Sequence, residues 1–165
     1  MLSMKRLSVY LDTSVLSFLF ADDEPELREI TREFFDRYLD RYEVAVSEVL
    51  LFEIGLTSDP VLRSRLQDAV TRYRLPIIHL TEEEQAEVLA LAQQYIDDGA
   101  IPARKREDAM HLAIATVREY DILLSWNFRH LANIRKETQV NAVNLQAGYG
   151  RPLNLLNPME VMYEE

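Results

Sequence analysis

Short apolar runs alternate with longer amphipathic segments along most of the chain. Four runs rich in β-branched and other apolar residues predict strands, at residues 9–11, 43–46, 76–79 and 122–124. The segments between them predict helices over residues 15–20, 25–42, 49–56, 60–73, 82–98 and 108–120, from about 127, and from 158. Because strands alternate with helices, we expect an α/β fold with parallel strands and right-handed crossovers.

Several helix ends carry recognisable capping residues. Asp59-Pro60 is expected to open one helix, and Thr81 with Glu84 forms the capping-box pattern that opens another. Gly99 is expected to end that second helix. No internal repeat or linker interrupts the pattern, so we predict a single domain over residues 1–165.

The composition narrows the range of functions. Forty-eight per cent of the 165 residues are hydrophobic and 28 per cent are charged, as in folded globular proteins. The net charge of −10 argues against nucleic-acid binding through a general basic surface. The absence of cysteine excludes disulfides and thiolate metal sites and fits a cytoplasmic protein. Asp12 interrupts the apolar run near the N-terminus, so we expect no signal peptide, and no run is long enough to span a membrane.

Polar residues follow the first and the fourth predicted strands. Asp12 comes directly after the first strand, and Asn127 ends the segment that follows the fourth. Ligands of parallel sheets bind beyond the carboxyl ends of the strands, so both side chains are candidates for a binding site. Asn127 is also a favourable N-cap for the helix expected after it.

Two further acids lie in largely apolar helices. Glu53 falls in residues 49–56, which are apolar on nearly every side, and an unpaired ionised carboxylate is costly there. It is expected to bind a cation, to pair with an arginine or to reach the surface. Asp108 opens the helix over 108–120, where the helix dipole stabilises a carboxylate whatever other role it has.

Taken together, these motifs resemble the PIN domain, a family of metal-dependent ribonucleases that includes VapC-type toxins of toxin–antitoxin pairs. The resemblance covers residues 9–131 and rests on four motifs in order: strand–Asp12-Thr13-Ser14, Ser47 followed six residues later by Glu53, helix-opening Asp108 and strand–Ser125-Trp126-Asn127. It implies a single three-layer PIN-like domain with a central, mostly parallel sheet of four to five strands flanked by helices.

The resemblance also implies a catalytic cluster that binds one or two Mg²⁺ or Mn²⁺ ions. Asp12, Glu53 and Asp108 match the family's first three acids and are the implied metal ligands. The fourth motif of the family is usually Thr/Ser-x-Asp, and Asn127 stands in the place of its aspartate. Carboxylates suit hard cations, and a bound Mg²⁺ activates water for hydrolysis. The implied activity is endonucleolytic hydrolysis of RNA.

Candidate substrate contacts surround these acids. They are the hydroxyl residues beside the acidic motifs and a basic run before Asp108: Thr13, Ser14, Ser125, Arg104, Lys105 and Arg106. The basic run either holds a phosphodiester or forms a solvated loop. His111 and His130 lie three residues after Asp108 and Asn127, where a packed, structural histidine is the better interpretation.

The implied partners are single-stranded or structured RNA and a cognate antitoxin protein. A homodimer is also expected, because the helices around Phe34-Phe35 and residues 88–91 offer more apolar surface than a small sheet covers.

Two other functions compete with the ribonuclease. A PIN-fold module that binds RNA or protein and cleaves weakly or not at all is favoured by Asn127 and by the net charge of −10. A phosphatase or phosphotransferase with Asp12 as a covalent nucleophile is disfavoured. Ser14 stands where that class has a second aspartate, and no lysine follows a later strand.

Overall fold

Five parallel strands form one sheet in the order β3-β2-β1-β4-β5. The computed structural model describes residues 5–127 and 130–163, and the side chains of residues 130–133 lie outside that description. The strands are β1 (Ser8–Leu11), β2 (Glu43–Ser47), β3 (Ile77–Ile78), β4 (Ile122–Leu124) and β5 (Asn154–Leu156). The expected α/β fold is confirmed, and β5 adds a strand that the apolar pattern did not single out.

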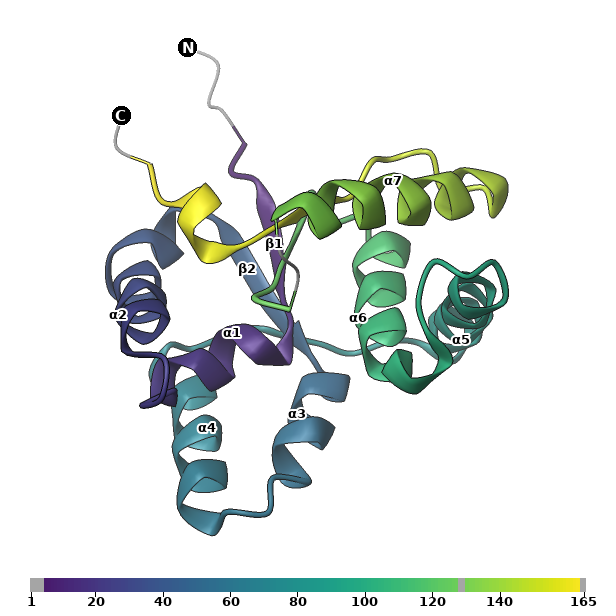
Figure 1. The fold of residues 1–165 in the computed structure, drawn as a ribbon. Coiled ribbons are helices and arrows are strands. Elements are labelled where there is room, and N and C mark those ends of the chain that lie inside the picture. The colour runs from purple at the N-terminus through teal and green to yellow at the C-terminus, as the bar shows by residue number, and fades with distance from the viewer. Residues whose placement is uncertain (1–4, 128–129, 164–165) are drawn as a thin grey trace.

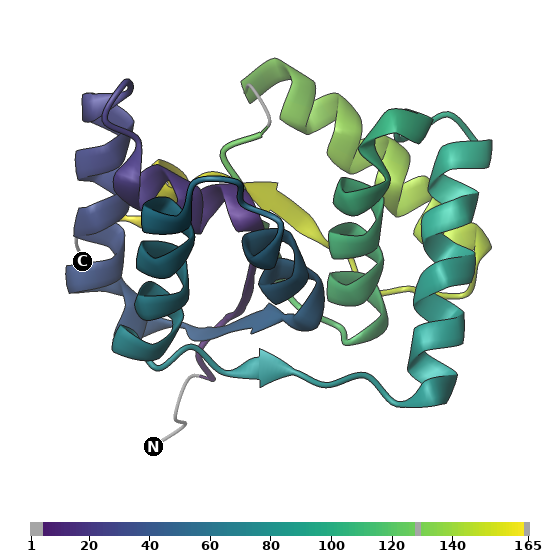
Figure 2. The same cartoon turned by 90° about the horizontal axis from the view of Figure 1, so that it is seen from below.

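Helices cover both faces of this sheet and make the fold three-layered. They are α1 (Thr13–Ser17), α2 (Pro25–Glu33), α3 (Glu48–Gly55), α4 (Pro60–Arg72), α5 (Glu82–Asp97), α6 (Arg106–Val117) and α7 (His130–Gln146). In Figures 1 and 2, α1, α2 and α4 lie on one side of the strands, and α5, α6 and α7 lie on the other. Among the described residues, no helix is both long enough and apolar enough to cross a membrane.

Strand β1 is buried on both faces because its side chains alternate between the two helical layers. Val9 and Leu11 pack in the core on the side of α2 and α4, together with Phe34. Tyr10 points the other way and packs with the residues of α5 and α6, including Leu112. Val9, Tyr10 and Leu11 are all fully inaccessible to solvent. The residue after β1 is therefore fixed at the centre of one sheet edge.

The expected caps are present, and some helix boundaries differ from the prediction. Asp59 accepts hydrogen bonds at the start of α4, Thr81 forms a capping box at the start of α5, and Gly99 has a positive φ just after α5. The predicted helix 25–42 is an α-helix only to Glu33 and continues as a π-turn and a 3₁₀-turn. Helix α6 begins two residues early, at Arg106, which leaves the basic run 104–106 in a 3₁₀-turn and the first residue of α6.

Most of the surface proposed for a homodimer is buried, although Leu89 within residues 88–91 is 49% exposed. Phe34, Phe35, Val88 and Leu91 are at most 3% exposed, because the helices that carry them bury these residues against the sheet. Sequence periodicity identifies an apolar helix face but does not say whether the sheet or a second molecule covers it. The homodimer itself stays a prediction.

Candidate active site

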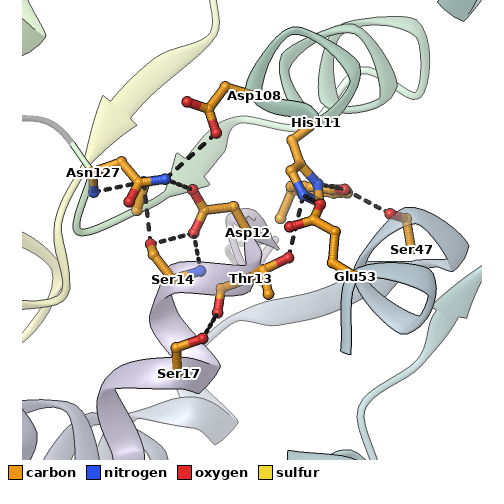
Figure 3. A network of polar contacts seen from close by, with 11 residues as sticks. Asp12, Thr13, Ser14, Ser17, Ser47, Glu53, Asp108, His111 and Asn127 are labelled. Carbon is orange, nitrogen blue, oxygen red and sulfur yellow. Dashed lines mark hydrogen bonds and ion pairs between the residues drawn. The ribbon is translucent and has the colours of Figure 1, made fainter. Parts of the chain in front are cut away.

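The four residues predicted for the catalytic cluster line one cleft beyond the carboxyl ends of the central strands. Asp12 follows β1, Glu53 comes from α3 after β2, Asp108 is in the first turn of α6, and Asn127 follows β4. The cleft has a volume of about 310 Å³, and its other lining residues are Thr13, Ser14, Ser17, Phe18 and His111. Figure 3 shows the side chains of Asp12, Glu53, Asp108 and Asn127 approaching one another from separate elements. Their catalytic and metal-binding roles stay predictions.

Asp12 is a buried carboxylate without a basic partner in the described part of the chain. It is 3% exposed, and its Oδ1 accepts hydrogen bonds from the backbone N–H (3.0 Å) and the hydroxyl (2.5 Å) of Ser14. Burial raises the pKa of Asp12. The charge of His111 and the hydroxyls of Ser125 and Ser14 oppose this shift, while the charge of Asp108 adds to it. The fold thus holds an acid whose negative charge the protein does not neutralise.

Asn127 connects Asp12 to Asp108. Its Nδ2 donates to Asp12 Oδ2 at 3.4 Å and to Asp108 Oδ1 at 3.5 Å. Burial raises the pKa of Asp108 as well, against the opposing charges of His111 and Lys105. The amide N–H groups of Asn127 therefore lie between two carboxylates, where a cation would also be stabilised. Asn127 lies three residues before α7, which begins later than predicted, at His130.

Glu53 is held by His111, an interaction that the sequence interpretation missed. His111 Nε2 donates to Glu53 Oε1 at 2.6 Å and lies 3.3 Å from the hydroxyl of Thr13. The His111 side chain is 3% exposed, so it is packed, as the sequence analysis favoured, but it also faces the acidic cleft. Its position one helical turn after Asp108 was the available signal. The side chain of His130 lies outside the described residues.

The two serines of the motifs join the turns that carry Asp12 and Asn127. Ser14 Oγ accepts from the Trp126 backbone N–H at 2.9 Å, and Ser125 Oγ accepts from the Asn127 backbone N–H at 3.0 Å. The first bond, together with the 3.3 Å contact between the two serine hydroxyls, joins the segment after β1 to the segment after β4. Both hydroxyls therefore have a structural task, and their contact with substrate stays a prediction, as does that of Thr13.

The three basic residues before Asp108 are not equivalent. Lys105 is close enough to Asp108 for its charge to oppose the burial that raises the pKa of that carboxyl. Arg106 instead donates to Gln93 on α5 at 2.9 Å. Arg104 is exposed in the 3₁₀-turn. Lys105 is therefore the best placed of the three to act beside the acids.

The donor set of the cleft fits a hard divalent cation. Asp12 and Asp108 supply carboxylate oxygens around a shared point, and neither has an Arg or Lys ion pair within the described chain. No three acidic or histidine side chains among the described residues are already grouped closely enough to hold a metal ion. A site that uses Asp12, Glu53 and Asp108 together therefore requires these side chains to move closer to one another.

Comparisons with known proteins agree with this architecture. The sequence model of the PIN domain matches residues 9–137. A similar solved structure is that of VapBC2 from Rickettsia felis bound to a DNA fragment from their promoter. It has a TM-score of 0.54 and 13% sequence identity, and the match covers 92% of this chain and 98% of that chain. The search of curated proteins gave no match.

The buried acids predict an unusual pH dependence of stability in the metal-free protein. Because the folded pKa of Asp12 is raised, the unfolded chain ionises first, and this group destabilises the fold increasingly as pH rises above about 4. The stability advantage of Asp12→Asn over wild type should therefore grow with pH and then level off above the folded pKa. Urea unfolding in EDTA between pH 4.5 and 7.5 measures it.

Asp121→Asn is the matched control for this measurement. Burial raises the pKa of Asp121, but hydrogen bonds from Ser8 and Arg151 outweigh it and lower the pKa overall. This carboxylate stabilises the fold above its unfolded pKa, so its removal should destabilise the protein at neutral pH. A stability difference between Asp12→Asn and wild type that does not vary with pH would contradict the assignment of Asp12 as an uncompensated charge.

Proposed function

Because this chain belongs to the PIN domain family, a family of nucleases, we propose that it is a Mg²⁺- or Mn²⁺-dependent endoribonuclease that hydrolyses RNA phosphodiester bonds. The observation that carries the proposal is the cleft where the buried, unneutralised Asp12 meets Asp108, with Glu53 on the same wall. Nothing else among the described residues offers a comparable set of converging carboxylates at the carboxyl edge of the sheet.

Each residue of the cleft has a defined task in this proposal. Asp12 and Asp108 hold the cation, with Glu53 as the third ligand and Asn127 as a neutral neighbour. Ser14 keeps Asp12 in one orientation through two hydrogen bonds. A bound divalent cation would offset phosphate charge and activate water. Lys105 is expected to attract the phosphodiester to the edge of the cleft.

We also propose that the protein is the toxin of a toxin–antitoxin pair and acts in the cytoplasm. The structural neighbour from Rickettsia felis is a VapBC complex, and this supports a cognate antitoxin as partner. A small chain with a net charge of −10 suits this role better than that of a general nuclease. Co-expression with the product of the adjacent upstream gene, followed by co-purification, tests for the partner.

A cleavage assay tests the enzymatic proposal. Single-stranded RNA incubated with the purified protein should be cut with Mn²⁺ or Mg²⁺ and left intact with EDTA, and added Mn²⁺ should restore cutting after EDTA. RNA that stays intact with both metals at millimolar concentration would overturn the proposed activity.

Asn127 favours a second candidate, a PIN-fold module that binds RNA or protein without cleaving it. The Asn127 amide already bridges Asp12 and Asp108, so it holds the two carboxylates without a metal ion. RNA binding that is equally tight in EDTA and in Mn²⁺, without cleavage, would support the module over the ribonuclease.

The basic run supplies a prediction about substrate binding. Lys105→Gln should raise the KM for RNA several-fold. It should also reduce the slope of log affinity against log salt concentration by about one, because each phosphate contact releases about one counterion. Arg106→Gln is the matched control, since Arg106 is engaged with Gln93. Equal effects of the two substitutions on KM would show that Lys105 has no special position.

A further inference from the structure

A chain of buried polar groups ends at Glu53. Ser47 Oγ lies 2.7 Å from the hydroxyl of Tyr10, that hydroxyl is hydrogen-bonded to His111 Nδ1, and His111 Nε2 bonds Glu53 Oε1 at 2.6 Å. Tyr10, Ser47 and His111 are at most 2% exposed. We propose that His111 is a positioning residue that fixes the carboxylate of Glu53, and that Tyr10 and Ser47 fix His111 from behind.

The chemistry of the partners sets the direction of these hydrogen bonds. A carboxylate only accepts, so His111 Nε2 carries a hydrogen and donates it to Glu53. In a neutral ring, Nδ1 then accepts the hydroxyl hydrogen of Tyr10, and in a charged ring Nδ1 donates to the Tyr10 oxygen instead. The hydroxyls of Tyr10 and Ser47 can each donate or accept, so they complete the chain of hydrogen bonds in both charge states of the ring. Both ring nitrogens therefore have a fixed partner, which favours a single ring orientation.

The chain of hydrogen bonds holds one carboxylate oxygen of Glu53 and leaves the other carboxylate oxygen available to a cation. Glu53 Oε1 is bonded to His111, and Figure 3 shows the carboxylate beside the imidazole with its other oxygen directed toward the side of the cleft that carries Asp12. The Glu53 side chain is 23% exposed. Among the described residues, His111 is its only basic partner. Without this contact, a flexible glutamate at the mouth of the cleft would sample several rotamers.

This inference rests on the proposed function, because it assigns Glu53 to the cation. Hydrogen-bonded partners behind metal ligands orient them, and their loss typically lowers metal affinity about 10- to 100-fold. Tyr10 is separated from Glu53 by one more hydrogen bond than His111 is. We therefore expect loss of the Tyr10 hydroxyl to lower metal affinity by about 10-fold, the lower end of that range. Tyr10 is fully buried and does not line the cleft, so we expect its effect to pass through His111, to which its hydroxyl is bonded.

The test compares two buried tyrosines that differ in what they support. Tyr10→Phe removes the hydroxyl behind His111. Tyr95→Phe removes a hydroxyl that is equally buried and bonded to Asn144 and Thr116, away from the cleft. Both variants lose buried hydrogen bonds and should be destabilised to a similar degree. Calorimetric titration with Mn²⁺ should show a dissociation constant about 10-fold weaker for Tyr10→Phe and unchanged for Tyr95→Phe.

Glu53→Gln separates failure of the inference from failure of the proposed function. If wild type binds no Mn²⁺, or Glu53→Gln binds it as tightly as wild type does, the metal role of Glu53 is overturned and the inference with it. If Glu53→Gln weakens binding while Tyr10→Phe matches Tyr95→Phe, only the positioning role of His111 is overturned. If Tyr10→Phe does not fold, the Mn²⁺ affinity of the milder variant Ser47→Ala tests the positioning role instead. A weaker Mn²⁺ affinity in that variant supports the chain, and an unchanged affinity overturns it.

Discussion

Asp12→Asn is expected to lower metal-dependent RNA cleavage by at least about 100-fold, while the metal-free protein becomes more stable. Loss of a partner behind a metal ligand already costs up to that factor, so loss of a ligand's charge should cost at least as much. Stability rises because the substitution removes a charge that burial and Asp108 both disfavour. The amide oxygen of asparagine can still accept the two hydrogen bonds from Ser14.

Asp12→Asn is expected to lower activity and raise stability, and these opposite changes distinguish loss of a metal ligand from damage to the fold. A substitution that merely damages the fold lowers activity and stability together. Asp97→Asn is a suitable control, because Asp97 is exposed at the end of α5 and its side chain accepts a hydrogen bond from Gln93 on the same helix. That variant should keep both properties. If Asp12→Asn cleaves RNA in Mn²⁺ as fast as wild type, Asp12 is not part of the catalytic site.

Asn127→Asp is expected to tighten Mn²⁺ binding by about 10-fold and, where a second ion limits the rate, to speed cleavage. A carboxylate attracts a divalent cation more strongly than a neutral amide does. The same change removes the N–H donors that now bridge Asp12 and Asp108, so it places a third negative charge beside two others. The metal-free variant should therefore be less stable than wild type, and the difference should disappear in saturating Mn²⁺.

Calorimetric titration with Mn²⁺ and urea unfolding with and without the metal measure both halves of this prediction. Gln139→Glu adds the same charge on an exposed position of α7 that does not line the cleft, and it should leave Mn²⁺ affinity unchanged. Equal affinity in Asn127→Asp and wild type would place residue 127 outside the coordination sphere. The wild-type enzyme, with its neutral residue 127, should need millimolar metal and favour Mn²⁺ over Mg²⁺.

The positions of the four motif residues followed from local sequence. Asp12 and Asn127 come after short apolar runs, and the ends of parallel strands share one edge of a sheet. Asp108 lies in the first turn of α6, as its position before an apolar run predicted. The connections between these residues could not be predicted, because Tyr10 and His111 are 101 residues apart and each looks like an ordinary core residue.

The remaining errors have a similar origin. Strand β5 has only two apolar residues and no β-branched residue, so the apolar pattern did not single it out, and its identity comes from pairing with β4. Phe34 and Val88 lie on helices whose apolar faces meet the sheet, and that packing is decided by tertiary structure. Ser47 precedes α3 as a cap would, but its hydroxyl bonds Tyr10 instead. Residues that bond across elements are the ones that sequence patterns describe least well.

The central claim is that the cleft between Asp12 and Asp108 binds a divalent cation. Crystals of the protein grown or soaked with Mn²⁺ and measured at the manganese absorption edge would locate the ion directly. We predict an anomalous peak in the cleft, about 2.1 Å from carboxylate oxygens of both Asp12 and Asp108, with the amide of Asn127 turned or displaced from its bridging position. An empty cleft at saturating Mn²⁺, with the Asn127 amide still bonded to both carboxylates, would contradict it.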